Sequence, residues 1–145
     1  MLRRLAADDR LVAIELNPDL AEHLAATLDD ERFTVVHGAA ADLADLAGGP
    51  VDAVVSGLPW TVMPTTDRNR TLDAVAAALA PSGRFTTFAY LHAAWTPPGR
   101  HLAAGLRERF TTVERGPVVW PNLPPAFVHL ARAPRQHVSA ASVSL

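Results

Sequence analysis

The chain has 145 residues, a formal net charge of −2, and 13 basic against 15 acidic residues. It contains no cysteine, which excludes disulfides and thiolate metal sites, and its arginines are scattered, which disfavours binding driven by the backbone of nucleic acids. No apolar run approaches the roughly 20 residues of a membrane span, and the first residues do not resemble a secretory signal. The composition therefore predicts a soluble, cytoplasmic, single-domain protein.

Strands and helices are predicted to alternate along the chain, because apolar β-branched runs are separated by capped, amphipathic segments. After a short helical opening, we expect a strand at 11–16, a helix from Asn17-Pro18, a strand at 33–36 and a short helix at 39–46. A strand at 51–55, a helix from Thr65 or Thr66 to Ala80, a strand at 84–91, a helix at 97–109 and strands at 110–114 and 127–133 follow. Two final strands with no helix between them predict a mostly parallel sheet with an antiparallel hairpin at one edge.

The segment Val51–Trp60 (VDAVVSGLPW) is the most informative one. A buried strand that runs into a Gly-Pro loop tipped by an aromatic residue is typical of a site at the carboxyl edge of an open α/β sheet. Gly57 allows close approach of a ligand, Pro59 stiffens the loop, and Trp60 offers a flat face to a cation. The alternative is an ordinary βα loop with a buried tryptophan.

Four segments together resemble the class I methyltransferases that use S-adenosyl-L-methionine (SAM). They are IELNP at 14–18, VVHGAAADL at 35–43, VDAVVSGLPW at 51–60 and VVWPNLPPAFVHL at 118–130. The SGLP loop and the W-x-N-L-P-P segment are similar to those of the bacterial phospholipid N-methyltransferases, which are relatives of the ribosomal RNA adenine dimethyltransferases. The resemblance implies a Rossmann-like α/β methyltransferase sheet with a C-terminal antiparallel hairpin, over a domain at 1–133 followed by a flexible tail at 134–145.

The resemblance also implies that the family's glycine-rich turn and first, central strand are missing from this chain. We therefore interpret the chain as an incomplete domain, either a fragment or a wrongly started gene product, with a degenerate protein as the alternative. The missing strand would lie between the strands at 11–16 and 51–55. We expect these two strands to flank a slot rather than to pair directly.

The cofactor implied by the resemblance is SAM. Glu15 stands where the family places a carboxylate that accepts hydrogen bonds from the ribose hydroxyls, although a capping or ion-pairing glutamate is the alternative. Ala39 replaces the usual aspartate at the adenine, so Asp42 is either its substitute or a solvated residue of a first helical turn. The predicted cofactor-binding set is completed by Leu16, Ala40 and Ser56.

The residues predicted to act on the acceptor are Ser56, Leu58, Pro59 and Trp60. The adenine dimethyltransferases have an N-L-P-Y loop here, and Gly57 stands at the asparagine position, which disfavours an adenine acceptor. Backbone carbonyls near Ser56 and Leu58 would steady the charge that develops on an amine, and Trp60 would either hold a methylated ammonium or pack.

These residues predict N-methylation of a phospholipid amine head group. An RNA adenine methyltransferase and a non-catalytic binding or dimerising module are the alternatives. The predicted partner is a small-molecule or lipid amine, reached through peripheral contact at the inner membrane face; nucleic acid is less favoured. No metal is predicted, because the histidines lack a ligand spacing.

Overall fold

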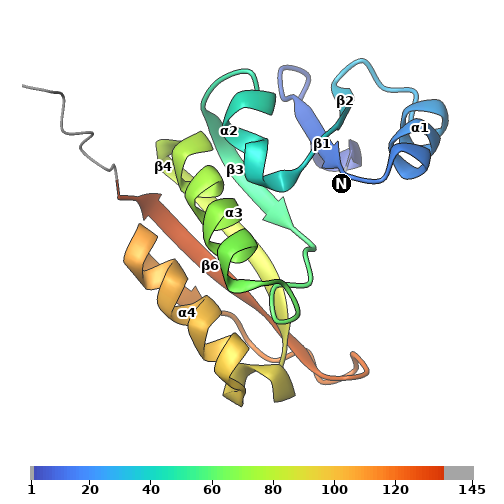
Figure 1. Cartoon of the computed structure of the whole chain (residues 1–145). Coiled ribbons are helices and arrows are strands. Elements are labelled where there is room, and N and C mark those ends of the chain that lie inside the picture. Colours follow the sequence, from blue (N-terminus) through green and yellow to red (C-terminus); the bar gives the residue numbers. More distant parts are fainter. Residues whose placement is uncertain (1, 136–145) are drawn as a thin grey trace, which may run out of the picture.

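The computed structural model describes residues 2–135, which form two sheets flanked by helices (Figure 1). The first part contains η1 (Leu2–Arg4), β1 (Leu11–Glu15), α1 (Pro18–Thr27), β2 (Phe33–His37), η2 (Ala40–Asp42) and α2 (Leu43–Leu46). The second part contains β3 (Val51–Ser56), α3 (Thr65–Ala78), β4 (Leu79–Tyr90), η3 (His92–Trp95), α4 (Pro97–Arg109), β5 (Phe110–Arg115) and β6 (Ala126–Pro134). The predicted alternation of strands and helices is confirmed.

The strands divide into a two-stranded sheet, β1-β2, and a four-stranded sheet of order β3-β4-β6-β5. β1 pairs with β2, and β3 with β4, in parallel. β6 is antiparallel to both β4 and β5, which confirms the predicted C-terminal hairpin. Within residues 2–135, β1 and β3 belong to different sheets and do not pair with each other, as expected.

The two sheets are linked through helices rather than through strand pairing. η2 and α2, which follow β2, pack against α3, whereas α1 packs on β1 and β2. Gly48 and Gly49 make the turn from α2 into β3 with φ values of +73° and +147°, a backbone region that favours glycine. In Figure 1, β1, β2 and α1 accordingly lie to one side of the four-stranded sheet.

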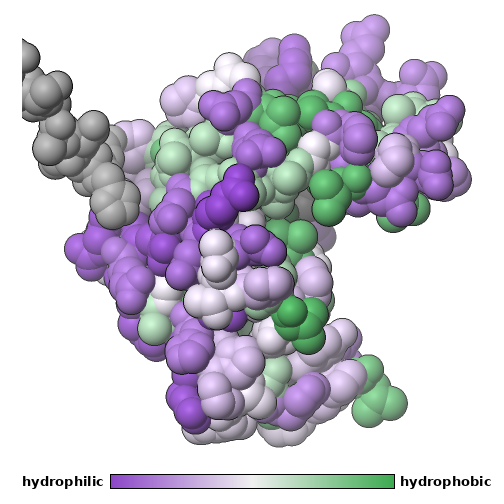
Figure 2. All heavy atoms as spheres, in the orientation of Figure 1, coloured by the Kyte–Doolittle hydropathy of each residue, from purple (hydrophilic) through white to green (hydrophobic). Residues whose placement is uncertain are grey.

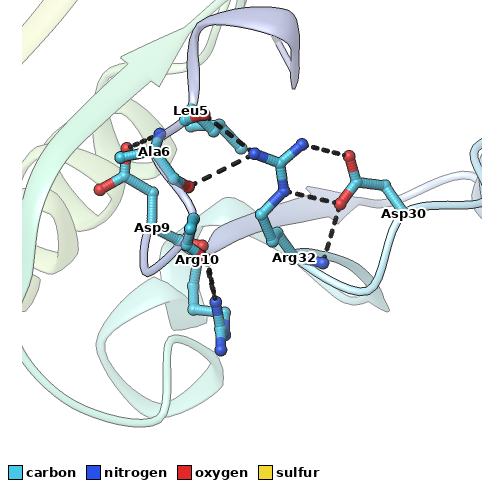
Figure 3. Close-up of polar contacts among 7 residues, drawn as sticks. Leu5, Ala6, Asp9, Arg10, Asp30 and Arg32 are labelled. Carbon is cyan, nitrogen blue, oxygen red and sulfur yellow. Dashed lines mark hydrogen bonds and ion pairs between the residues drawn. The ribbon is translucent and has the colours of Figure 1, made fainter.

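Arg32 fastens the segment before β1 to the α1–β2 connection (Figure 3). Its guanidinium donates to both carboxylate oxygens of Asp30, at 2.6 and 2.9 Å, and to the carbonyl of Leu5 at 2.9 Å. The carboxylate of Asp9 accepts a 2.8 Å hydrogen bond from the Ala6 N–H, which closes the turn that leads into β1. Side chains thus fix the entry to the first sheet.

The main core lies between the four-stranded sheet and the helices α3 and α4. It consists of Trp60, Leu72, Val75, Leu79, Phe85, Leu102, Leu106, Phe110 and Ala131. Alternation along β4 turns Phe85 and Thr87 into this core and leaves Phe88 and Tyr90 more exposed. Arg109 on α4 bonds Asp73 on α3 at 2.6 Å, which ties the two covering helices together.

The boundary between α3 and β4 differs from the prediction. The helix ends at Ala78 rather than Ala80, and β4 begins at Leu79, which pairs with Val51. A register shift between Val51 and Ala53 takes up the extra residues of the predicted turn at 81–83. The predicted threonine cap is also wrong, because Pro64 is the N-cap residue of α3 and its side chain makes no capping bond.

The end of the described chain continues the sheet. β6 extends to Pro134, and the N–H of Arg135 donates to the carbonyl of Arg109 at 2.7 Å. The remainder of the predicted tail, residues 136–145, lies outside the described residues.

Candidate functional site

The predicted cofactor residues lie where β1 and β2 end. β1 ends at Glu15 and β2 at His37, and the two residues are partners in the parallel register. The N–H of Gly38 donates to the carbonyl of Glu15 at 3.0 Å, so the loop after β2 is held beside the end of β1. Parallel pairing therefore brings Glu15 and the loop that contains Ala39 and Ala40 to one sheet edge.

The carboxylate of Glu15 is held in place but retains free acceptor capacity. One oxygen, Oε1, accepts a 2.8 Å hydrogen bond from the N–H of Asn17. Asn17 is the N-cap residue of α1, as predicted, and its side-chain oxygen accepts from the N–H groups of Asp19 and Leu20. Because a carboxylate has about four acceptor positions, Glu15 can accept further hydrogen bonds from a ligand.

The neighbouring predicted residues differ in their environment. Leu16 is 69% exposed, while Ala39 and Ala40 are half-buried. Asp42 lies in η2, with one carboxylate oxygen 3.8 Å from the guanidinium of Arg70 on α3. Both side chains are exposed, so this ion pair contributes little to stability.

The loop after β3 is ordered by its own hydrogen bonds. The hydroxyl of Ser56 accepts from the N–H of Leu58 at 3.2 Å, and the carbonyl of Leu58 accepts from the N–H of Trp60 at 2.9 Å. The carbonyl of Pro59 accepts from the N–H of Val62 at 3.0 Å. A Cβ placed on Gly57 would meet no atom within 4 Å, so the backbone there is open to a ligand.

Trp60 is part of the core, which corresponds to the packing alternative rather than to an exposed platform. The side chain is 2% exposed and lies edge-on to Phe85, with ring centroids 6.0 Å apart. Its indole N–H donates to the Thr87 hydroxyl at 2.9 Å, and that hydroxyl donates to the Ser56 carbonyl at 3.1 Å. The face of the indole ring that was expected to receive a cation is therefore used in packing, and Trp60 anchors the loop to the core.

Large exposed apolar side chains gather at one edge of the four-stranded sheet. The strand directions place the ends of β3, β4 and β5 and the start of β6 at this edge. The side chains are Val62 (77% exposed), Trp95 (71%), Trp120 (68%) and Leu123 (95%), and we call them the apolar rim. In Figure 2 the lower end of the molecule is mostly white to pale purple, with separate green patches toward its right side.

The apolar rim was not predicted as a site. Its signal in the sequence is a large apolar residue in each of three loops that follow a strand. A hydrogen bond joins two of these loops, since the N–H of Leu91 donates to the carbonyl of Pro125 at 2.8 Å. The backbone bridge between Val119 and Ala126 closes the loop that carries Trp120 and Leu123.

Residues 2–135 contain no cluster of three or more His, Cys, Asp or Glu side chains that could hold a metal ion. None of the helices within these residues is long and apolar enough to cross a membrane.

Comparison with known proteins gives a family match and several sequence relatives. Residues 1–87 match a family model described as "Methyltransferase domain". A 66-residue segment is 42% identical to Ribosomal RNA small subunit methyltransferase A of Kineococcus radiotolerans, and 67 residues are 39% identical to the protein of that name from Streptomyces avermitilis. Each match covers 42% of this chain, but only 22% and 23% of the respective relative.

The fold is similar to solved structures of longer chains. N-methyltransferase NodS from Bradyrhizobium japonicum WM9, in complex with S-adenosyl-L-homocysteine, has a TM-score of 0.64 at 18% identity, over 87% of this chain and 67% of that one. An rRNA methylase from Streptococcus thermophilus has a TM-score of 0.60 at 14% identity, over 85% and 73%. At these identities the likeness concerns the fold alone.

Proposed function

The chain belongs to the methyltransferase domain family, and from this premise we propose that it takes part in SAM-dependent methylation of the amine of a phospholipid head group. The observation that carries the proposal is the loop after β3. It presents backbone carbonyls at a sheet edge and is held by the Trp60–Thr87–Ser56 hydrogen bonds. The same edge of the sheet bears the apolar rim.

The residues after β1 and β2 fit the nucleoside part of SAM. Glu15 has acceptor positions left for ribose hydroxyls, and the exposed side chain of Leu16 offers apolar contact to a flat base. When bound, SAM supplies a methyl group activated by its sulfonium. Ala39 and Ala40 add small side chains that leave room near the base, and Asp42 is our candidate acceptor for its amino group.

The loop after β3 would orient the acceptor amine. The carbonyl of Ser56 accepts from the Thr87 hydroxyl and the carbonyl of Leu58 from the Trp60 N–H. Because a carbonyl oxygen has two lone pairs, we propose that both also accept from N–H groups of the amine. Two such contacts align the amine nitrogen and steady the positive charge that grows on it. Pro59 and Trp60 hold these carbonyls in place rather than touch the reacting atoms.

The apolar rim supports a lipid acceptor. Tryptophan is favoured at membrane interfaces, where its ring lies among the head groups, and exposed leucine inserts into the acyl boundary. Trp95, Trp120 and Leu123 lie on loops at the edge to which Ser56 also belongs. Insertion of this rim would bring head-group amines to the loop that is proposed to orient them.

Methyl-labelled SAM incubated with lipid vesicles and with ribosomal RNA tests the proposal. We expect label in vesicles of phosphatidylethanolamine and none in vesicles of phosphatidylcholine, whose nitrogen is already quaternary. Label in RNA alone would reverse the assignment. Label in neither pool would contradict methyl transfer and favour the binding-module alternative.

RNA adenine methylation is a second candidate, favoured by the 42% identity to Ribosomal RNA small subunit methyltransferase A over 66 residues. Gly57 discriminates between the two, because it has no side-chain carbonyl to accept from an adenine amino group. A Gly57→Asn variant would provide one, and there is open space at this position. An RNA acceptor predicts that G57N raises RNA labelling, whereas a lipid acceptor predicts no gain.

A further inference from the structure

A groove of about 380 Å³ lies between α4, the ends of β4 and β5 and the start of β6, away from the residues proposed to bind SAM. Its lining includes the buried apolar side chains of Leu102 and Phe127 and the half-buried Val113. Thr61, which directly follows Trp60 in the β3–α3 loop, also lines it. The groove therefore adjoins the proposed acceptor loop, and its volume is within the usual range for a small-molecule site.

Three exposed arginines give the groove a positive rim. Arg100 and Arg107 come from α4, and Arg115 comes from the end of β5. Within residues 2–135, none of the three makes an ion pair, and Glu114 is the acidic residue of the lining. Three guanidiniums against one carboxylate leave an excess of positive charge, which favours an anion.

Two of the arginines are held in defined positions. The guanidinium of Arg115 lies 3.9 Å from the ring centroid of Phe127, in a cation–π contact. Arg100 donates to the carbonyl of Trp95 at 2.8 Å. A guanidinium that is already positioned loses less side-chain entropy when it binds a phosphate.

His129 adds a polar group to the lining of the groove. It is buried on β6, with its ring 4.9 Å from that of Phe127. Burial lowers the pKa of His129, and the charges of Arg115 and Arg107 lower it further, so the ring is neutral at pH 7. A neutral imidazole keeps one N–H donor for an anionic oxygen.

We propose that this groove binds the phosphate of a phospholipid head group, with Arg107 and Arg115 as the main ligands of the phosphate. The apolar side chains of the lining would contact the glycerol and the first acyl carbons. This assignment of the groove rests on the proposed function, because it places the phosphate of the lipid acceptor beside the β3–α3 loop, which is proposed to orient the amine of the same lipid. Trp95 connects the groove to the apolar rim, because it belongs to both. This continuity favours a lipid over a free phosphate or a nucleic acid.

The test is an NMR titration of the full chain with labelled histidine. The probes are a short-chain phosphatidylethanolamine below its micelle concentration, inorganic phosphate, and a diacylglycerol of the same chain length. We expect saturable shifts of the His129 signals with the phospholipid, a rise of its pKa on binding, weaker binding of phosphate, and none of diacylglycerol. The Arg107→Gln and Arg115→Gln variants should each weaken phospholipid binding at least about tenfold, because each removes a charged hydrogen-bond donor to the phosphate.

Arg132→Gln is the matched control, because Arg132 is exposed on β6 and is not part of the lining. Equal binding of diacylglycerol, equal binding of phosphate and phospholipid, or equal losses in R107Q and R132Q would overturn the proposal. A short RNA that shifts His129 when the phospholipid does not would overturn it as well. Arginine-dependent lipid binding without methyl transfer would leave the groove assignment standing and contradict the proposed function.

Discussion

The indole N–H of Trp60 and the hydroxyl of Thr87 form a 2.9 Å hydrogen bond that joins the β3–α3 loop to β4. The same hydroxyl donates to the carbonyl of Ser56 at 3.1 Å. The buried Thr87 hydroxyl thus accepts the hydrogen bond of the Trp60 indole and positions the Ser56 carbonyl, which is proposed to contact the acceptor amine. The geometry of the loop consequently depends on a residue of the next strand.

Replacing Thr87 by valine should lower the free energy of unfolding by about 1–3 kcal/mol, because the buried Trp60 N–H loses its acceptor. Thr87→Ser keeps the hydroxyl and should cost less. Urea unfolding measures both. In a Trp60→Phe background, which has no indole N–H, the cost of Thr87→Val should shrink, and an unchanged cost would show that the hydrogen bond does not couple the two residues.

Glu15→Ala should weaken SAM binding by about tenfold or more, because hydrogen bonds to a carboxylate contribute about 1.5–3 kcal/mol. Calorimetry or saturation-transfer NMR gives the affinity. Glu22→Ala, at an exposed position of α1, is the matched control. An equal loss in both variants would remove Glu15 from the proposed site.

The stability of the first sheet should depend on pH through Asp30. Hydrogen bonds from the Arg32 guanidinium and the Arg32 N–H lower the pKa of the Asp30 carboxyl to about 2. The unfolded value is about 3.9, so the stabilisation is fully present above about pH 4 and is lost as the pH falls towards 2. A carboxyl titration followed by NMR should give a midpoint near 2.

Asp30→Asn should remove this part of the pH dependence, and Asp29→Asn, at an exposed neighbouring position, should retain it. A midpoint near the unfolded value for Asp30 would mean that the contact with Arg32 does not persist in solution.

Leu123→Ser and Trp120→Ser should each reduce co-sedimentation with anionic vesicles. Burial of a large apolar side chain contributes about 1.5–3 kcal/mol, so the partition coefficient should fall at least about tenfold. Leu20→Ser removes an apolar side chain that is 51% exposed on α1, outside the apolar rim, and should leave partition unchanged. Retention of vesicle binding in the rim variants would exclude this edge as the contact.

Local signals allowed the sequence to predict some elements well. α4 has the predicted bounds, because Thr96 caps it and Pro97 occupies its first position. The start of β4 was missed, because Pro81 and Gly83 indicate a turn and the pairing that extends the strand to Leu79 depends on Val51, far along the chain.

The environment of Trp60 shows the same limit for the site. A tryptophan after Gly-Leu-Pro is compatible with an exposed platform or with a buried anchor, and Thr87 decides between them from 27 residues away. The groove that is lined by Arg100, Arg107 and Arg115 shows the same limit, because its residues come from α4, β5 and β6 and only the fold brings them together. Glu15 was placed correctly at a strand end because its position follows from the strand itself.

The division of the sheet has a consequence for amide hydrogen exchange. The first unit is the β1-β2 sheet with α1, and Ala21 is the buried residue of this helix. This unit should open locally far more often than the four-stranded sheet, which shares a core with α3 and α4. Glu15 belongs to the first unit and Ser56 to the second. Part of the binding free energy of a ligand that contacts both would therefore be used to suppress the local opening of the first unit. Its binding would slow amide exchange in β1 and β2 and leave the exchange rates of β4 and β6 unchanged.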